Sequence, residues 1–122
     1  MSLLIKNFLS ALEERDLIKA KSFLAEGFQM EFPGGEIFTD LSELVDWGKK
    51  RYKSVTKDYE HFDELYIDDI KIVYCYGFLR GIWLNGSSFS GIRFIDRFMI
   101  KDDKIFDQKV WNDLSEFLSK ES

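Results

Sequence analysis

The segment SSFSGIRFIDRFMIKDDKIFDQKVW, residues 87–111, decides the fold class. Apolar and polar side chains alternate over residues 87–101 and again over 104–111, and this period of two is that of a strand with one buried face. Asp102 and Asp103 lie between the two runs and are typical of a turn. The segment therefore predicts an antiparallel hairpin.

Alternation of the same kind extends upstream of this hairpin. It predicts two further antiparallel strands, over residues 61–67 and 71–84, with Asn85-Gly86 as the turn into residue 87. Gly77 and Gly81 interrupt the longer strand and indicate bulges that curl the sheet. The C-terminal half is thus expected to be a curved sheet with a concave face.

The N-terminal half has helical spacing instead. It predicts a helix over residues 3–14, a second from Asp16 to a cap at Gly27, and a third from Asp40 through residue 54. A short strand pair, 28–32 and 36–38, surrounds a Pro-Gly-Gly turn, and residues 113–120 form a terminal helix or ordered tail. Three helices on one face of a sheet define an α+β fold, and the length fits a single domain over residues 1–122.

The composition excludes several classes of partner. The chain carries 17 basic and 22 acidic side chains, a net charge of −5, which speaks against binding to nucleic acid or to an anionic membrane surface. No apolar run reaches membrane-spanning length, and residues 1–15 lack the basic start of a signal peptide. Cys75 is the single cysteine and can form no intrachain disulfide, so we expect a cytoplasmic protein.

Sequence motifs for cofactors and metals are absent. The chain has no phosphate loop, dinucleotide-binding glycine pattern, HExxH pair or nucleophile elbow, so neither a cofactor nor a metal is expected. The single histidine, His61, lies beside Glu60 and Asp63, and a half-exposed surface histidine is favoured over a catalytic base.

Asp96 is the candidate functional residue. Alternation places it on the same strand face as four apolar side chains, those of Ile92, Phe94, Phe98 and Ile100. A buried carboxyl either pairs with a donor, such as Arg80 or a tyrosine hydroxyl, or keeps its proton through a raised pKa. The first reading is structural and the second functional, and the sequence leaves both open.

The last strand sorts its side chains by the same rule. Gln108, Val110 and Asn112 are expected to face inward, because the opposite choice would bury Asp107 and Lys109. The outer face then carries an apolar patch that suggests a homodimer, the alternative being a monomer with scattered surface aromatics. This patch consists of Ile95, Arg97, Met99, Ile105 and Trp111.

Several segments resemble the nuclear transport factor 2-like superfamily, and within it the SnoaL-like group, which is similar to ketosteroid isomerase. They are LEERDL at residues 12–17, EFPGG at 31–35, DRF at 96–98, DKI at 103–105 and VWND at 110–113. The resemblance covers nearly the whole chain. It implies a cystatin-like cone, with three N-terminal helices packed on a curved, mainly antiparallel sheet around a pocket.

The resemblance leaves catalysis uncertain. In the isomerase pattern a tyrosine, a strand acid and an aspartate base act together, and the matching positions here hold Phe8, Asp96 and Phe32. The further aspartate of the superfamily's epoxide hydrolases corresponds to Val110. Most of the polar groups that these reactions need are therefore apolar here.

The favoured prediction is a domain that binds a flat hydrophobic molecule, polyketide- or steroid-like, oriented by Asp96, Gln108 and Asn112. The predicted apolar lining is Phe8, Phe32, Trp47, Phe94, Phe98 and Val110. One alternative is a cyclase, dehydratase or isomerase in which protonated Asp96 donates a hydrogen bond, with Glu31, His61 or Tyr59 as base. Another is a protein-interaction module that acts through the outer sheet face.

Overall fold

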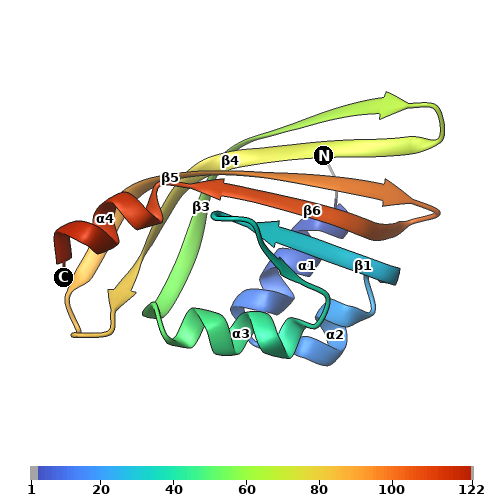
Figure 1. Ribbon diagram of the computed structural model, residues 1–122. Coiled ribbons are helices and arrows are strands. Elements are labelled where there is room, and N and C mark those ends of the chain that lie inside the picture. The colour runs from blue at the N-terminus through green and yellow to red at the C-terminus, as the bar shows by residue number, and fades with distance from the viewer. Residues whose placement is uncertain (1–2, 122) are drawn as a thin grey trace.

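A computed structural model describes residues 3–121 of the chain. The elements follow in the order α1 (Leu3–Glu13), α2 (Leu17–Lys21), β1 (Leu24–Phe32), β2 (Glu36–Phe38), α3 (Leu41–Lys49), β3 (Tyr52–Ile67), β4 (Ile70–Trp83), β5 (Ser88–Lys101), β6 (Lys104–Asn112) and α4 (Leu114–Glu121). The strands form one sheet of order β2-β1-β6-β5-β4-β3, in which only the β1–β6 pair is parallel. Helices α1, α2 and α3 lie together on one face of the curved sheet (Figure 1). The predicted α+β architecture is confirmed.

The hairpin pairing follows the alternation of the sequence. β5 and β6 meet at Lys101 and Lys104, and β4 and β5 pair antiparallel from Ile82 with Ser88 to Lys71 with Ile100. Asp102 and Asp103 both have positive φ, of 52° and 59°, which a tight turn requires and aspartate tolerates. The predicted C-terminal strands are therefore confirmed.

The sheet bends at the two strand glycines. A Cβ on Gly77 would lie 2.1 Å from the Asp58 carbonyl oxygen, and one on Gly81 would lie 2.1 Å from that of Ser54. The β3 register shifts next to both contacts, between Tyr59 and His61 and between Tyr52 and Ser54. Bulges were predicted in the glycine-bearing strand itself, but their extra residues lie in the neighbouring strand β3. The glycines are needed because only a residue without a side chain allows so close an approach.

Two predicted helix ends were wrong, because strand pairing takes over earlier than the helical spacing indicated. The second helix ends at Lys21 rather than Gly27, since Leu24 already pairs with Ile105 of β6. The third ends at Lys49 rather than residue 54, since Tyr52 pairs with Trp83 and β3 begins there instead of at residue 61. The terminal segment is a helix, α4, as one of the two expectations had it.

Phe8 of α1 forms the centre of the core. Its ring is fully buried and makes edge-to-face contacts with Phe28 and Phe98, at centroid distances of 6.3 and 6.2 Å.

Ile105, which was expected on the outer face, is also fully buried. The register shifts between Met99 and Ile100, so that Ile105 lies opposite Ile100 and turns inward. No helix among residues 3–121 is long and apolar enough to cross a membrane.

Candidate functional site

A buried ion pair joins β3 to β5 inside the cone. Asp96 is fully buried between its cross-strand neighbours Cys75 and Val110, and Lys57 Nζ donates a hydrogen bond to Asp96 Oδ2. Asp96 thus has an internal donor, but the expected partner was wrong. Arg80 instead donates from Nε to Asp58 Oδ2, at 2.9 Å, on the exposed side of β3.

Each member of the pair shifts the pKa of the other. Burial raises the pKa of Asp96 above its ordinary value, and the Lys57 ammonium opposes that rise. Burial alone lowers the pKa of Lys57, but the Asp96 carboxylate outweighs this effect and the pKa of Lys57 is raised overall. Lys57 therefore remains an ammonium at neutral pH, and Asp96 Oδ2 accepts its hydrogen bond.

One oxygen of the pair has no partner. Within residues 3–121, Asp96 Oδ1 accepts no hydrogen bond although it is buried. Lys57 is bonded through only one of its three N–H groups to Asp96, and its Nζ lies 5.1 Å from the centroid of the Phe94 ring. The pair therefore offers both a free acceptor and further donor capacity.

The ion pair lines a cavity of about 50 Å³. The side chains around it come from α3, from the start of β3, from the concave face of the sheet and from α4. They are Phe32, Trp47, Arg51, Tyr52, Val55, Lys57, Leu79, Phe94, Asp96, Val110, Asn112 and Leu114. Six of these are residues that the sequence singled out: Asp96, Phe32, Trp47, Phe94, Val110 and Asn112.

Three other predicted pocket residues lie elsewhere. Phe8 and Phe98 fill the interior of the cone with their contacting rings, so they are core rather than cavity lining. Gln108 is 2% exposed and lies opposite Phe98, one inward-facing position from Val110. The pocket is therefore shallower than expected, because aromatic side chains occupy its deep end.

A second cavity adjoins the first. It measures about 100 Å³, lies between α1, α3 and β3, and shares Phe32, Tyr52, Val55 and Lys57 with the first. The Tyr52 hydroxyl lies so close to α3 that a Cβ on Gly48 would be 3.0 Å from it. The four shared side chains therefore form the boundary between the two cavities.

An aromatic cluster supports the cavity wall. Phe32, Phe38 and Trp47 pack at centroid distances between 5.3 and 5.8 Å. The Arg51 guanidinium carbon lies 4.3 Å from the centroid of the Trp47 ring. The planar guanidinium of Arg51 therefore stacks on the indole of Trp47 at the edge of the cavity.

Sequence reasoning missed Arg51, Tyr52 and Lys57. All three fall in the stretch that was assigned to the end of the third helix or to the loop after it. The missed signal was the inward alternation of Val55, Lys57 and Tyr59, which becomes visible once β3 is started at residue 52.

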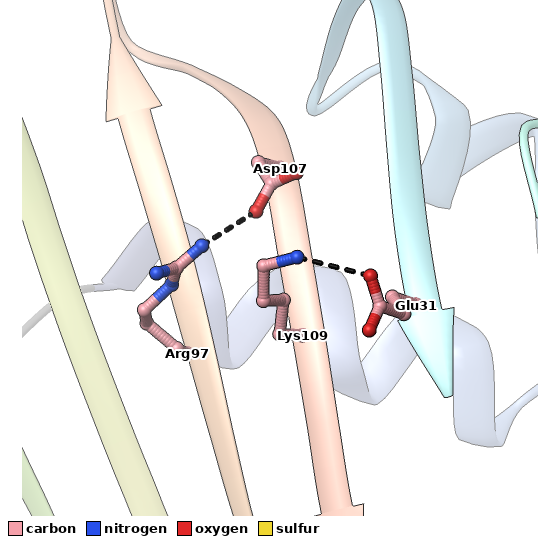
Figure 2. Close-up of polar contacts among 4 residues, drawn as sticks. All are labelled: Glu31, Arg97, Asp107 and Lys109. Atoms are coloured by element: carbon pink, nitrogen blue, oxygen red, sulfur yellow. Dashed lines mark hydrogen bonds and ion pairs between the residues drawn. The ribbon is translucent and has the colours of Figure 1, made fainter. Parts of the chain in front are cut away.

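Two of the expected bases point away from the cavity. Glu31 accepts a hydrogen bond from Lys109 Nζ at 3.0 Å, next to the Arg97–Asp107 ion pair of 2.9 Å (Figure 2). His61 is exposed and pairs with Asp63 at 2.9 Å. Tyr59 does lie near the ion pair, where burial raises its pKa. Among the described residues, no three His, Cys, Asp or Glu side chains come together as a metal site requires.

The outer sheet face carries charge pairs and exposed apolar side chains. Asp107 and Lys109 point outward as predicted, and both have ion-pair partners there. Ile95 is 36% exposed and Trp111 is 47% exposed, and the two are direct cross-strand neighbours. With Tyr76 and Phe78 they line an open groove of about 680 Å³.

The sequence matches no model of a known protein family and no curated protein. The fold does have close structural counterparts. One is a nuclear transport factor 2-like protein of unknown function from Burkholderia pseudomallei, with TM-score 0.75 and 15% identity over 98% of this chain and 97% of that one. Another is TerC, crystallised with polyporic acid, with TM-score 0.75 and 14% identity over 95% and 93%. A putative ketosteroid isomerase from Shewanella frigidimarina gives TM-score 0.70 and 20% identity over 88% and 91%.

These likenesses define the class of fold. The chain has the nuclear transport factor 2-like fold, the cone in which polyketide cyclase-like and ketosteroid isomerase-like proteins are also built. At identities of 20% or less they establish the fold and no particular reaction.

Proposed function

We propose that this protein binds a small planar molecule in the cavity beside Trp47, with the polar end of the molecule on the Lys57–Asp96 pair. The observation that carries the proposal is that Asp96, a residue of the cavity lining, has a buried Oδ1 without a hydrogen-bond partner among the described residues. A buried acceptor without a partner costs about 1–3 kcal/mol, and a ligand hydroxyl would remove that cost. The Lys57 ammonium beside it suits the oxygen of the same hydroxyl or of a carbonyl.

The size of the cavity favours a single ring. Typical ligand pockets enclose about 300–1,000 Å³, whereas a cavity of about 150 Å³ holds a benzene-sized molecule. The two cavities beside Tyr52 measure about 50 and 100 Å³, so a one-ring phenol fits once Tyr52 moves. A polyketide- or steroid-sized ligand requires further displacement of the aromatic core. The polyporic acid crystallised with TerC supports a planar ligand class.

The roles of the lining residues follow from their chemistry. Phe32, Trp47, Phe94 and Val110 contact the faces and edge of the ring, and Asn112 offers its amide N–H groups, since its Oδ1 already accepts from the Leu114 amide at 3.1 Å. Asp96 and Lys57 bind the hydroxyl.

Cys75 is buried and unreactive, which agrees with a reducing, cytoplasmic setting.

A ligand screen by thermal shift tests the proposal. At about a hundred times its dissociation constant, a phenol adds roughly 2.7 kcal/mol to wild-type stability, a shift of several degrees. We expect Asp96→Asn to lose most of the shift, and Asp58→Asn, which alters an exposed ion pair on the same sheet, to keep it. Val55→Phe retains the buried pair and fills the space between the cavities, so it too should lose the shift. Equal shifts in wild type and Val55→Phe would contradict the proposal.

A second candidate function is an isomerase, favoured by the side-by-side donor and acceptor of the ion pair. Asp96 Oδ1 would take a proton from the carbon beside a carbonyl while a Lys57 N–H binds the developing oxyanion. The proton then returns from Asp96 to the γ-carbon, so that the double bond moves into conjugation and all atoms balance. Conversion of cyclohex-3-enone to cyclohex-2-enone, followed by ultraviolet absorbance, tests this candidate. A rate equal in wild type and Asp96→Asn would exclude it.

We also propose that the outer sheet face forms a homodimer. Ile95, Met99 and Trp111 provide apolar contact area, and Arg97 with its neighbours provides charges of both signs. A patch with both signs can pair with its own copy across a twofold axis. The interaction-module alternative uses the same face for another protein.

A further inference from the structure

Arg51 is an arginine whose charge has no counter-ion. Arg80, Arg93 and Arg97 each pair with an aspartate, and Arg15 donates to the Leu12 carbonyl oxygen at 2.7 Å. Among residues 3–117, whose side chains the structure describes, Arg51 has neither an ion pair nor a hydrogen-bond acceptor, although it is half-buried and lines the cavity. A partly desolvated guanidinium without an anion is unfavourable.

The position of Arg51 is held by stacking. Its guanidinium carbon lies 4.3 Å from the centroid of the Trp47 ring, and Trp47 is in turn held by Phe32 and Phe38. A guanidinium stacked through its face keeps its N–H edge free, and that edge matches the two oxygens of a carboxylate. Burial lowers the pKa of Arg51, which agrees with a cation that lacks an anionic partner.

The charges around the cavity point to the same ligand. Its lining carries two cations, Arg51 and Lys57, and one anion, Asp96. Because Lys57 and Asp96 neutralise one another, the charge of Arg51 remains. A ligand with one negative charge would therefore balance the lining.

We infer that the ligand is a small aromatic hydroxy acid, whose carboxylate binds Arg51 and whose hydroxyl binds the Lys57–Asp96 pair. This inference rests on the proposed binding function and names the chemical class of its ligand. The ring then lies against Trp47, between an anion-binding end and a hydroxyl-binding end. Arg51 determines specificity for acids over neutral phenols.

The test compares acids with uncharged counterparts of the same shape. The probes are 2-, 3- and 4-hydroxybenzoate and the three matching hydroxybenzamides, titrated by calorimetry into wild type, Arg51→Gln and Arg80→Gln. We expect at least one acid to bind wild type ten times or more tightly than its amide. Arg51→Gln should abolish this preference by weakening the binding of the acid to that of its amide, and Arg51→Lys should restore it in part. Arg80→Gln removes an exposed charge on β4 and should keep the preference for the acid.

Two results overturn the inference in distinguishable ways. The first is equal binding of acids and amides to wild type, or a preference for acids that survives in Arg51→Gln. Either observation shows that the pocket binds phenols and that Arg51 does not recognise a carboxylate. The proposed function then stands and the hydroxy-acid class does not. If none of the six probes binds wild type, both are contradicted for single-ring ligands.

Discussion

At the scale of single residues, the molecule is organised around the charge pair of Lys57 and Asp96. Removing two charges from water is costly, and their mutual attraction repays that cost only when both are present. The Asp96 side chain is 0% exposed and that of Lys57 is 20% exposed, so Asp96 carries most of the desolvation. The pair therefore gives the cavity a polar end more than it stabilises the fold.

This view predicts strong coupling between the two residues. Lys57→Met leaves a buried carboxylate without its counter-ion and should lower the free energy of unfolding by about 3–5 kcal/mol. The double variant Lys57→Met/Asp96→Leu should recover most of that loss, because no charge remains to be desolvated. Urea unfolding of both single variants and the double variant measures the coupling. Losses that simply add in the double variant would disprove it.

The buried thiol of Cys75 should make the free energy of unfolding depend on pH in the alkaline range. Burial raises the pKa of its thiol to about 12, above the ordinary value of 9.0. The unfolded chain therefore loses this proton at a lower pH than the folded one, and the free energy of unfolding falls as pH rises from about 9. Between pH 8 and 10 the decline due to the thiol should be about 1.4 kcal/mol. Urea unfolding of wild type and Cys75→Ala at both pH values isolates it, and identical declines would refute the assignment.

The sequence indicates the buried acid of the site and part of the cavity lining, but not the ion-pair partner of the acid. Asp96 is recognisable because four apolar side chains alternate with it on one strand. Lys57 was missed because a charged residue at an inward position breaks the pattern that identifies a strand, and its pairing with Asp96 joins strands 39 residues apart in the chain. Non-local ion pairs of this kind leave no periodic signal. Phe8 and Phe98 could not be assigned to core or pocket lining either, since both environments are apolar.

At the scale of elements, the curvature of the sheet depends on the close approach of β3 to β4. Residues 52–60 of β3 contain the extra residues of two bulges, close to Gly77 and Gly81 of β4, and this segment carries Lys57. Gly77 and Gly81 allow this path because their missing side chains leave room for carbonyl oxygens. The strand glycines thus position one half of the ion pair.

We expect Gly77→Ala to lower the stability of the fold far more than an alanine substitution at an exposed strand position does. Its Cβ would meet the Asp58 carbonyl oxygen at 2.1 Å, so the backbone must shift at a cost of about 1–3 kcal/mol or more. Ser90→Ala, at an exposed position of β5, serves as the control and should change stability by no more than about 0.5 kcal/mol. Thermal unfolding compares the two. A Gly77→Ala variant as stable as the control would mean that the bulge does not need glycine.

The strands of the C-terminal half were predictable because alternation and turn residues agree there. The failures lie where two signals conflict. Residues 22–27 have helical spacing and a capping glycine, yet their pairing with β6 draws the chain into the sheet. Residues 52–60 are highly charged, and only the pairing with β4 makes them a strand. In both places tertiary contacts outweigh local preference.

At the scale of the whole molecule, the two faces of the cone differ in shape and composition. Its concave side is closed by α1, α3 and the aromatic core, and retains the small cavities beside Tyr52. Its outer side is open and combines Ile95 and Trp111 with charge pairs. The proposed dimer would cover the outer face without reaching the cavity.

The proposed dimer predicts the mass in solution. Light scattering after gel filtration should give twice the 14.4 kDa of one chain. Trp111→Asp should reduce the mass to that of a monomer, because it places a charge in the apolar part of the interface. Tyr66→Asp alters an aromatic that is 68% exposed near the tip of the β3–β4 hairpin and should leave the dimer intact. A wild type that is monomeric at micromolar concentration would contradict the interface.

Binding beside Trp47 is the central claim, and the three tryptophans allow it to be located directly. Trp47 lines the cavity, Trp83 lies in the core against Phe89, and Trp111 lies on the outer face. Nitrogen-15 correlation spectra resolve their three indole N–H signals, which single Trp→Phe variants assign. Titration with the hydroxybenzoates and hydroxybenzamides should move the Trp47 signal most and leave that of Trp111 in place. Movement of Trp111 alone, or of none of the three at millimolar ligand, would contradict binding in the cavity.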